Sequence, residues 1–595
     1  MTQQRDDTHR PEAPAEEDRY QAERNFGWFT GERDPEEEAA EQRQLQQQLL
    51  QQQLLRQPSA PAEPRYAAPA EPGYTVPDVP DVGWDPLPSS RRTWVSRLVL
   101  LVVLVTQALL TLRLGNSAFE DEALYLYAGH LQLHHLQGGP PLPDSFASYF
   151  SGSPLLYPPL AAAADAHFGL AGARALSLAF MLGATALLYM MTRRLFNERV
   201  ALVAAACFAV TQSTLFMGAL ATYDALALFL IALAAWLAVR TARNGWWLAT
   251  LLMPPVLLLA VAVKYASLMY VPVVIALACL AAVPHHAWWS LLRLFTIPAV
   301  AVGGAYAALR LTGSDVLEGL RSTTTGRAAG HGVRLDMLRD CAEWGGLLFA
   351  LALLGTVLYA RKGRMSEAPT LQAVRVPRRL WRVLMGLLLT GTALLAPAYQ
   401  IWIHESVSLH KHIGYGLLFA TPMAALGITR VVGSHFRHPQ LGILAWVTML
   451  VLGMVQSTSL YHAWPNSDQL ITTLDRQLVP DGHYLVEANS VPRYYLRRQV
   501  GFDQWTSTYT ITYQTKDKKV LTGEAGFKAA LTDSYFDVVV FDRTVTGALD
   551  DKLTQQLRAE GKYRLLVSIP YRNSYGTGFY QVWIPVKKNA PQPQQ

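Results

Sequence analysis

The feature that most constrains this chain is a long series of apolar segments between Trp94 and about Leu460. A helix needs roughly 20 apolar residues to cross the hydrocarbon core of a membrane. About eleven segments approach this length, near 94–113, 169–192, 199–218, 222–240, 246–264, 266–283, 288–310, 342–360, 380–399, 411–430 and 440–459. The sequence therefore predicts a polytopic α-helical membrane protein with about eleven transmembrane helices over residues 94–460.

Both ends of the chain are polar, in contrast to its middle. Only 16% of the 595 residues are charged, whereas a soluble protein would carry roughly a quarter. Residues 1–93 combine an acidic stretch, a Leu/Gln run and Pro/Ala-rich spacers. This composition predicts a disordered tail, with a short self-association helix in the Leu/Gln run as the alternative. Residues 586–595 are predicted to form a second loose tail.

Residues 461–585 have the pattern of a small soluble α/β domain. HYLVEA at 483–488 and FDVVVFD at 536–542 are typical of buried strands, and GEAGFKAALTDS at 523–534 and LDDKLTQQLRAEG at 549–561 are typical of helices. The domain has no glycine-rich phosphate loop and no nucleophile elbow. We therefore expect the chemistry to lie in the membrane part.

Arginine and lysine concentrate in alternate gaps between the apolar segments, which predicts a cytoplasmic N-terminus. An odd number of spans then places the C-terminal domain outside the cell membrane. The net charge is +6. We attribute this excess to cytoplasmic loops and expect no nucleic-acid partner.

Three acidic residues, Glu120, Asp121 and Glu122, stand immediately beyond the first apolar segment, on the predicted outer side. A carboxylate at the edge of a membrane cavity suits a general base, which takes a proton from an attacking hydroxyl. The alternative is three solvated loop acids. Behind them, 123–136 has the spacing of an interfacial amphipathic helix.

Cationic residues gather in the other predicted outer regions. Lys264 ends an apolar segment, where a lysine is costly and suggests a function, although it could snorkel to the interface. The loop near 311–341 contains Arg321, Arg327 and Arg334. Arginine forks match phosphate oxygens, but these arginines could equally pair with the aspartates of the same loop.

A further cationic stretch, HESVSLHKHIGYG at 404–416, contains His410, Lys411 and His412. The spacing matches no zinc motif, so anion binding or proton handling is favoured over a metal. Three cysteines, Cys207, Cys279 and Cys341, show no disulfide or zinc pattern. We expect no metal and no cofactor.

Several of these stretches resemble the GT-C membrane glycosyltransferases, especially the protein O-mannosyltransferase and lipid A aminoarabinose transferase superfamily. The similar stretches lie within about residues 94–285 and are FEDEALYLYAGH at 119–130, YPPL at 157–160, ATYDALALFLIALAAWLA at 221–238 and VAVKYASLMYVPV at 261–273. The resemblance implies a GT-C-type fold.

The resemblance also implies a polyprenyl-phosphate-linked sugar donor, with membrane lipid around it, and an inverting single displacement. It makes Asp121 the catalytic base, with Glu122 as the next candidate, and Lys264 a ligand of the lipid phosphate. Glu120, Tyr157 and Asp224 would shape the pocket. The outer-loop arginines and the residues 410–412 would help to bind the phosphate.

Other functions fit parts of the same pattern. A polytopic transporter is the main alternative, although no inverted repeat is visible. A non-catalytic cell-envelope assembly protein and a ligase that uses a diphosphate-linked donor are the others. The sequence identifies neither the sugar nor the acceptor, which could be a protein, a lipid or a glycan.

Overall fold

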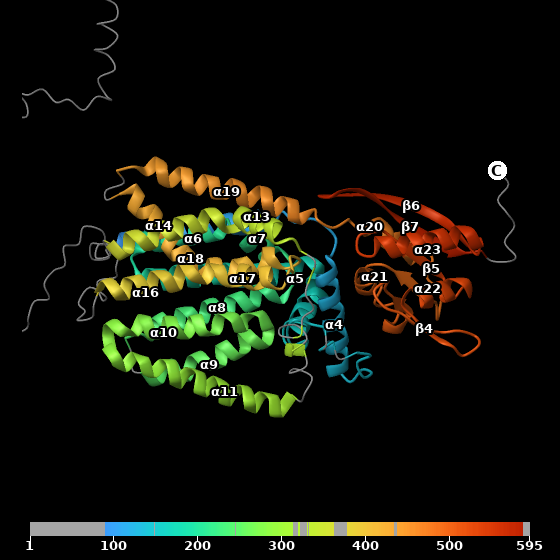
Figure 1. Ribbon diagram of the computed structural model, residues 1–595, viewed down its shortest axis with the longest axis horizontal. Coiled ribbons are helices and arrows are strands. Elements are labelled where there is room, and N and C mark those ends of the chain that lie inside the picture. Colours follow the sequence, from blue (N-terminus) through green and yellow to red (C-terminus); the bar gives the residue numbers. More distant parts are fainter. Residues whose placement is uncertain are drawn as a thin grey trace, which may run out of the picture. The chain divides into compact units, whose positions relative to one another are not determined.

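The structure is a computed structural model that describes residues 90–144, 146–147, 149–243, 246–312, 319–321, 326, 330, 332–361, 378–433 and 437–586. The predicted N-terminal tail lies outside the described residues up to position 89, and the predicted C-terminal tail lies outside them from position 587. Arg327 also lies outside them. Within the described ranges the chain forms a helical bundle followed by a domain built on a β-sheet (Figure 1).

The bundle begins with α3 (Ser90–Thr111), and α4 (Glu120–Leu136) and α5 (Tyr157–Leu195) follow it. Helix α4 includes the acidic triplet in its first turn, where negative charge is favourable to the helix dipole. The Glu122 carboxylate accepts the backbone N–H of Phe119 at 2.9 Å and so caps the helix. Helix α5 starts on Tyr157 and Pro158, and it is broken at Gly169, whose φ is 66°.

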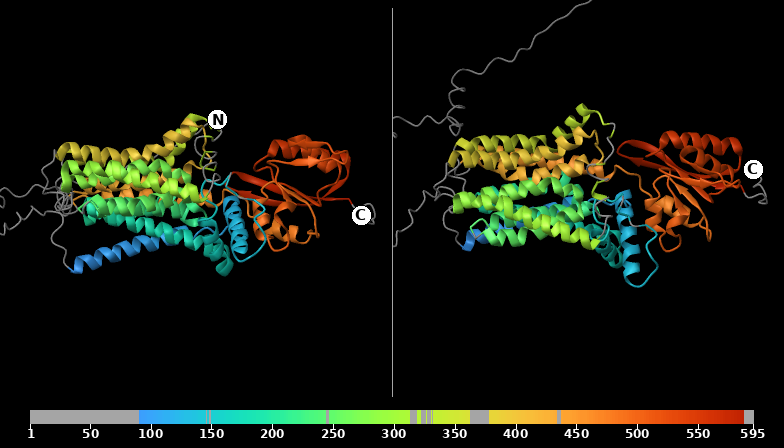
Figure 2. Two further views of the ribbon diagram at one scale, coloured as in Figure 1. Left: turned by 90° about the horizontal axis from the view of Figure 1, so that it is seen from below. Right: turned by 60° about the horizontal axis from the view of Figure 1, so that its bottom comes forward.

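The remaining helices of the bundle lie side by side, as the two turned views show (Figure 2). They are α6 (Glu198–Ala209), α7 (Gln212–Ala219), α8 (Tyr223–Arg240), α9 (Trp246–Val263), α10 (Val271–His286), α11 (Arg293–Thr312), α13 (Arg334–Cys341), α14 (Leu347–Arg361), α16 (Arg378–Gly391), α17 (Leu395–Trp402), α18 (Leu409–Val432) and α19 (Pro439–Tyr461). A short 3₁₀ helix, η1 (Tyr265–Tyr270), connects α9 to α10.

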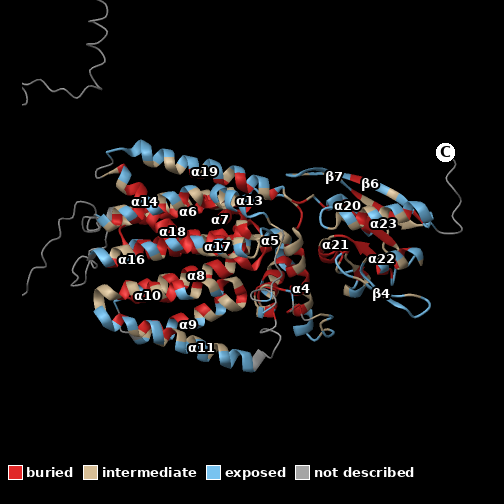
Figure 3. Cartoon of the chain, in the orientation of Figure 1, coloured by how far each residue is buried: buried red, intermediate tan, exposed pale blue. Residues whose placement is uncertain are grey.

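Burial separates the inner helices from the outer ones (Figure 3). In α18, 89% of the apolar window is buried, whereas the corresponding fraction is 22% in α19 and 6% in α3. The exposed side chains of α19 include Leu441, Ile443, Leu444, Val447 and Val451. Apolar surface of this extent suits contact with lipid, because water would disfavour it.

Eight helices of the described residues are long and apolar enough to cross a membrane, or nine if the bent pair α6 and α7 forms one span. One of the eight, 265–310, contains both α10 and α11, and α9 is apolar but shorter. The polytopic helical fold is thus confirmed. The number of about eleven crossings stays a prediction, as does the orientation of the two ends.

The C-terminal domain contains a five-stranded sheet in the order β2-β1-β5-β7-β6. Strands β1 (Tyr484–Val486), β2 (Trp505–Thr506) and β5 (Val538–Phe541) are parallel, and β7 (Gly576–Pro585) and β6 (Tyr563–Asn573) complete the sheet in antiparallel fashion. A separate hairpin joins β3 (Thr512–Gln514) to β4 (Val520–Thr522). The helices are α20 (Asp468–Asp475), α21 (Ser490–Tyr495), α22 (Gly523–Thr532) and α23 (Gly547–Glu560).

The predicted α/β character of this domain is confirmed. HYLVEA contains β1 and FDVVVFD contains β5, and all residues of both strands are buried. The two helical segments that the sequence indicates are α22 and α23.

The sheet domain is held against α4 and α5 by buried polar contacts. Asp165 of α5 accepts a hydrogen bond from the Tyr494 hydroxyl at 2.5 Å and an ion pair from Arg497 at 3.2 Å. His130 of α4 contacts the same carboxylate at 2.5 Å. A buried carboxylate with these three partners links α4 and α5 to the sheet domain.

Candidate functional site

The three acids at the start of α4 have three different environments. Glu122 is fully buried and accepts both arms of the Arg174 guanidinium, at 2.9 Å and 2.7 Å. It also accepts the backbone N–H of Ala221 at 2.7 Å, in addition to its cap on Phe119. With four donors on two oxygens, Glu122 anchors the helix and has little capacity left for a substrate.

Asp121 lies at one end of a row of alternating charges. Its carboxylate pairs with the Lys411 ammonium at 3.0 Å. Lys411 in turn lies 4.0 Å from the carboxylate of Asp224, and Asp224 pairs with Lys264. The row therefore contains two carboxylates and two ammonium groups, which neutralise one another. We call these four residues the charge row.

Each member of the charge row comes from the end of a helix. Asp224 is in the first turn of α8, Lys264 follows the last residue of α9, and Lys411 is in the first turn of α18. The backbone of Lys264 is extended (φ −147°, ψ 118°), because the chain changes there from α9 to η1. Helix ends that meet at one level place polar side chains together without breaking the helices.

Burial decreases along the row. The side chains of Asp224 and Lys264 are 1% and 5% exposed, that of Lys411 is 9% exposed, and that of Asp121 is 38% exposed. Buried charges of this kind persist only when they are paired. Asp121 is thus the member that a molecule from outside reaches first, and Lys264 is the deepest cation.

Tyrosines surround the inner part of the charge row. The Lys264 ammonium lies 5.1 Å from the centre of the Tyr223 ring, and the Tyr223 hydroxyl receives a hydrogen bond from Tyr125 at 2.7 Å. The Tyr415 hydroxyl donates to the backbone carbonyl of Asp224 at 3.1 Å. These rings exclude water while their hydroxyls remain bonded, so the charges in the row act at short range.

The other predicted site residues are not part of the charge row. The His410 ring packs against Phe216 and Trp344, with ring centres 4.9 Å and 6.0 Å away. The Gln400 amide contacts His412 Nδ1 at 2.7 Å. Tyr157 is buried and shares a hydrogen bond of 2.8 Å with Ser177.

The two arginines that the structure describes, Arg321 and Arg334, are exposed. No hydrogen bond or ion pair links either guanidinium to the charge row in the described ranges. Arg327 lies outside those ranges. A phosphate-binding role for the three arginines stays a prediction.

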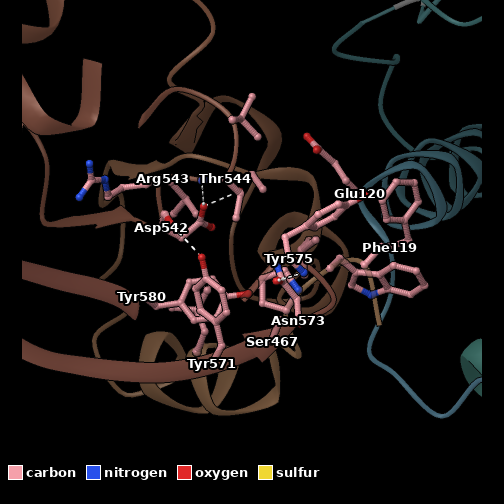
Figure 4. Close-up of a pocket in the computed structure, with 18 of the residues that line it drawn as sticks. Phe119, Glu120, Ser467, Asp542, Arg543, Thr544, Tyr571, Asn573, Tyr575 and Tyr580 are labelled. Carbon is pink, nitrogen blue, oxygen red and sulfur yellow. Dashed lines mark hydrogen bonds between the residues drawn. The ribbon is translucent and has the colours of Figure 1, made fainter. Parts of the chain in front are cut away.

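Glu120, the first of the three acids, lines a cavity that α4 shares with the C-terminal domain (Figure 4). Burial is the largest cause that raises the pKa of Glu120 from 4.5 to about 7, and the negative charges of Asp121 and Glu487 raise it further. Neighbouring acids in the sequence thus face different sites: Asp121 faces the charge row, and Glu120 faces this cavity.

Two charged residues that hold this region together, Arg174 and Asp165, were not predicted from the sequence. Both interrupt the apolar stretch of α5. The same signal that singled out Lys264, a charged residue within an apolar segment, could have found them. Within the part of the chain that the structure describes, no group of three or more His, Cys, Asp and Glu residues could hold a metal ion.

Part of the chain matches a known family, and the fold is similar to that of a solved structure. Residues 163–308, which include Asp224 and Lys264, match the family model of dolichyl-phosphate-mannose-protein mannosyltransferase. The structure of ArnT from Cupriavidus metallidurans bound to undecaprenyl phosphate is similar, with a TM-score of 0.53 and 12% identity, over 85% of this chain and 100% of that chain. No curated protein sequence matches the chain.

Two other solved structures are similar at a lower level. The Archaeoglobus fulgidus oligosaccharyltransferase in complex with Zn and sulfate has a TM-score of 0.46 and 16% identity, over 80% of this chain and 72% of that one. Arabinofuranosyltransferase AftD from mycobacteria has a TM-score of 0.43 and 14% identity, over 83% of this chain and 40% of that one. The resemblance to the GT-C glycosyltransferases that the sequence predicts is confirmed by the family model and the fold of ArnT.

Proposed function

We propose that this chain is a membrane glycosyltransferase that moves a sugar from a polyprenyl-phosphate carrier to an acceptor on the outer face of the membrane. The observation that carries the proposal is the charge row, which joins Asp121 to Lys264 through Lys411 and Asp224. A base and two phosphate-binding cations are the groups that this transfer needs, and the row ends on a helix that borders the soluble domain.

The donor phosphate binds by exchange of ion pairs. In the structure the two ammonium groups are neutralised by Asp224 and Asp121. A lipid phosphate that enters the bundle replaces Asp121, which is 38% exposed, as the partner of Lys411, while Lys264 keeps the buried Asp224 and donates a further N–H to a phosphate oxygen. Negative charge grows on the phosphate as the sugar leaves, and fixed cations at that position lower the barrier.

Asp121 acts as the base. It accepts the proton of the acceptor hydroxyl while the hydroxyl oxygen forms a bond to the anomeric carbon. The bond from that carbon to the phosphate oxygen breaks, and its electron pair leaves with the phosphate. Because attack and departure take place on opposite faces of the sugar, the anomeric configuration inverts.

Lys411 connects donor binding to base catalysis. Its ammonium holds the Asp121 carboxylate at 3.0 Å and lies between this acid and Asp224. When the donor phosphate engages Lys411, one Asp121 oxygen is released and can accept the acceptor proton. This order favours attack by the acceptor only after the donor is in place, and it disfavours loss of the sugar to water.

The test is transfer by the purified full chain in proteoliposomes that contain polyprenyl-monophosphate sugars and an extract of envelope acceptors. Mass spectrometry of the glycans and glycoproteins is compared with and without the protein. We expect a mass increase of one sugar residue from a monophosphate-linked donor. Transfer that requires a diphosphate-linked donor would identify a ligase, and solute movement without transfer would identify a transporter.

A further inference from the structure

A cavity of about 460 Å³ lies between the start of α4 and the C-terminal domain. Figure 4 shows Phe119 and Glu120 at the α4 side, facing Asp542, Tyr571 and Tyr580 of the sheet domain. Its volume is within the range of about 300–1,000 Å³ that ligand pockets occupy.

The carboxyl groups of this cavity lack cationic partners. Glu120 has no hydrogen bond or ion pair among the described residues, and its pKa is raised to about 7. Asp542 is 6% exposed and accepts the N–H of Thr544 at 2.9 Å and its hydroxyl at 2.5 Å. Burial is again the largest cause that raises the pKa of Asp542, and the Glu487 carboxylate adds to it.

Glu487 explains why Asp542 and not Glu487 takes up the proton. The Glu487 carboxylate accepts four backbone N–H groups, those of Asp542, Arg543, Val545 and Thr546, at 2.5–3.0 Å. Burial raises the pKa of Glu487, but hydrogen bonds from the carboxyls of Asp542 and Asp550, together with those from the backbone N–H groups, outweigh it and lower the pKa to about 2. Near neutral pH the Glu120 carboxyl of the cavity, with a pKa of about 7, can donate as well as accept a hydrogen bond.

Aromatic rings form the apolar part of the wall. Tyr571 and Tyr580 pack with ring centres 5.1 Å apart, and Phe119 packs on Trp464 at 5.0 Å. Tyr575, in the turn between β6 and β7, also lines the cavity and is 82% exposed. Rings beside hydrogen-bonding groups suit a ligand that has both apolar and polar faces.

One buried hydroxyl of the wall has unused hydrogen-bonding capacity. Ser467 lines the cavity, is 3% exposed, and its Oγ has no partner in the described part of the chain. Buried polar atoms usually have a partner, and those that lack one need an explanation. A hydroxyl-rich ligand in the cavity would supply such a partner.

The charges of the wall narrow the class of ligand. The Arg543 guanidinium of the wall already pairs with Asp551 at 2.7 Å and so offers no unpaired cation to a phosphate, which disfavours an anionic lipid headgroup. A cationic ligand would require both carboxyls, those of Glu120 and Asp542, to ionise, which the burial that raises the pKa of each disfavours. A neutral polyol requires no ionisation and can use both the donors and the acceptors.

The geometry points to this cavity as the acceptor site, and to a neutral saccharide with free hydroxyls as its ligand. This inference rests on the proposed function, because Glu120 of the cavity directly precedes Asp121, the proposed base. Because Glu120 and Asp121 are consecutive in the first turn of α4 and Asp121 is 38% exposed, a saccharide that extends from the cavity past Glu120 would bring a hydroxyl to the base. The acceptor is then a glycan and not a bare serine or threonine side chain.

The test is saccharide binding to the full chain in lipid nanodiscs, measured by calorimetry without donor. The probes are mannotriose and maltotriose as neutral saccharides, deacetylated chitotriose as a cationic one, and a Ser/Thr-rich peptide. We expect at least one neutral probe to bind, and Glu120→Ala and Tyr575→Ala to weaken it by about tenfold each, the order expected for one lost polar or ring contact.

Glu524→Ala and Phe579→Ala are the matched controls, because both residues are in the same domain but do not line the cavity. Asp121→Asn should bind the saccharide as wild type does while it loses transfer. Binding of no neutral probe, preference for the amine or the peptide, or wild-type affinity in both cavity variants would overturn the inference. Saccharide binding without any transfer by wild type would count against the proposed function alone.

Discussion

The two sides of the start of α4 present the same kind of group, a carboxyl, in opposite surroundings. On the membrane side Asp121 and Asp224 each face an ammonium group, and the charge row is neutral as a whole. On the side of the C-terminal domain Glu120 and Asp542 face other carboxyls, and the pKa of each is raised. Burial raises the pKa of Glu120 and Asp542, and the neighbouring carboxyls raise it further because no cation pairs with either acid.

This difference in charge favours a different class of ligand on each side of the start of α4. Cations that are balanced by acids can exchange one anion for another, which suits the phosphate of a lipid-linked donor. Protonated carboxyls beside aromatic rings suit a neutral polyol. Both sites meet at the first turn of α4, which contains Glu120 and Asp121, and Glu122 holds that turn in place through Arg174.

We expect the largest loss of stability when Asp224, the acid in the middle of the charge row, is replaced. Asp224→Asn leaves Lys264 buried beside Tyr223 without its carboxylate, and we expect a loss of about 3–5 kcal/mol in the free energy of unfolding. The double variant Asp224→Asn/Lys264→Met should regain much of this stability but not transfer. Thermal unfolding in detergent and a transfer assay are the measurements. Unchanged stability of Asp224→Asn would show that the pair contributes little.

Removing Lys264 should affect donor use more than folding. In Lys264→Ala the Asp224 carboxylate still has Lys411 at 4.0 Å, so one cation remains close to it. We expect transfer to fall by roughly 10²–10³, the cost of removing one group that stabilises developing charge. The measurement is the dependence of the transfer rate on donor concentration, together with a melting curve. If the transfer rate of the variant depends on donor concentration as that of wild type does, Lys264 does not bind the donor.

The smallest expected effect is the change of stability with pH that Glu120 causes. The pKa of its carboxyl is higher in the folded chain than the usual 4.5, so the folded state binds the proton more tightly than the unfolded state. Stability should therefore fall as pH rises from about 4.5 to about 7 and then level off. Because the carboxyl is partly open to water, the change should be below about 1 kcal/mol.

The control for this pH effect is Glu120→Gln, which has no proton to lose. Melting temperatures of the variant and of wild type are compared at pH 5 and pH 8. Wild type should lose more stability than the variant between these values. Parallel curves would mean that Glu120 does not experience the burial and negative charges described above.

The sequence was sufficient to predict those parts of the fold and the site that depend on local composition. The length of the apolar segments predicted the helices of the bundle, and short apolar runs predicted the buried strands β1 and β5. The residue patterns at 523–534 and 549–561 predicted α22 and α23. Lys264 was singled out because a lysine in an apolar segment must find a partner. The structure supplies that partner, Asp224, which the sequence analysis had named separately.

What the sequence could not predict depends on pairs that are far apart in the chain. Asp121 and Lys411 are separated by 290 positions, and the cavity brings Glu120 together with the β6–β7 hairpin. No local sequence pattern indicates that residues so far apart in the chain lie close together, because their distance depends on how the helices pack. The pairing of Glu122 with Arg174 was missed for the same reason, although it distinguishes the anchoring acid from the proposed base.

The central claim is that Asp121 takes the proton of the acceptor while the charge row holds the donor. Asp121→Asn keeps the shape of the side chain but removes its basicity, and it can be assayed in proteoliposomes for both donor binding and transfer. We expect donor binding to persist and the transfer rate to fall by roughly 10²–10⁴, the usual contribution of a general base. Transfer at the wild-type rate by this variant would contradict the account.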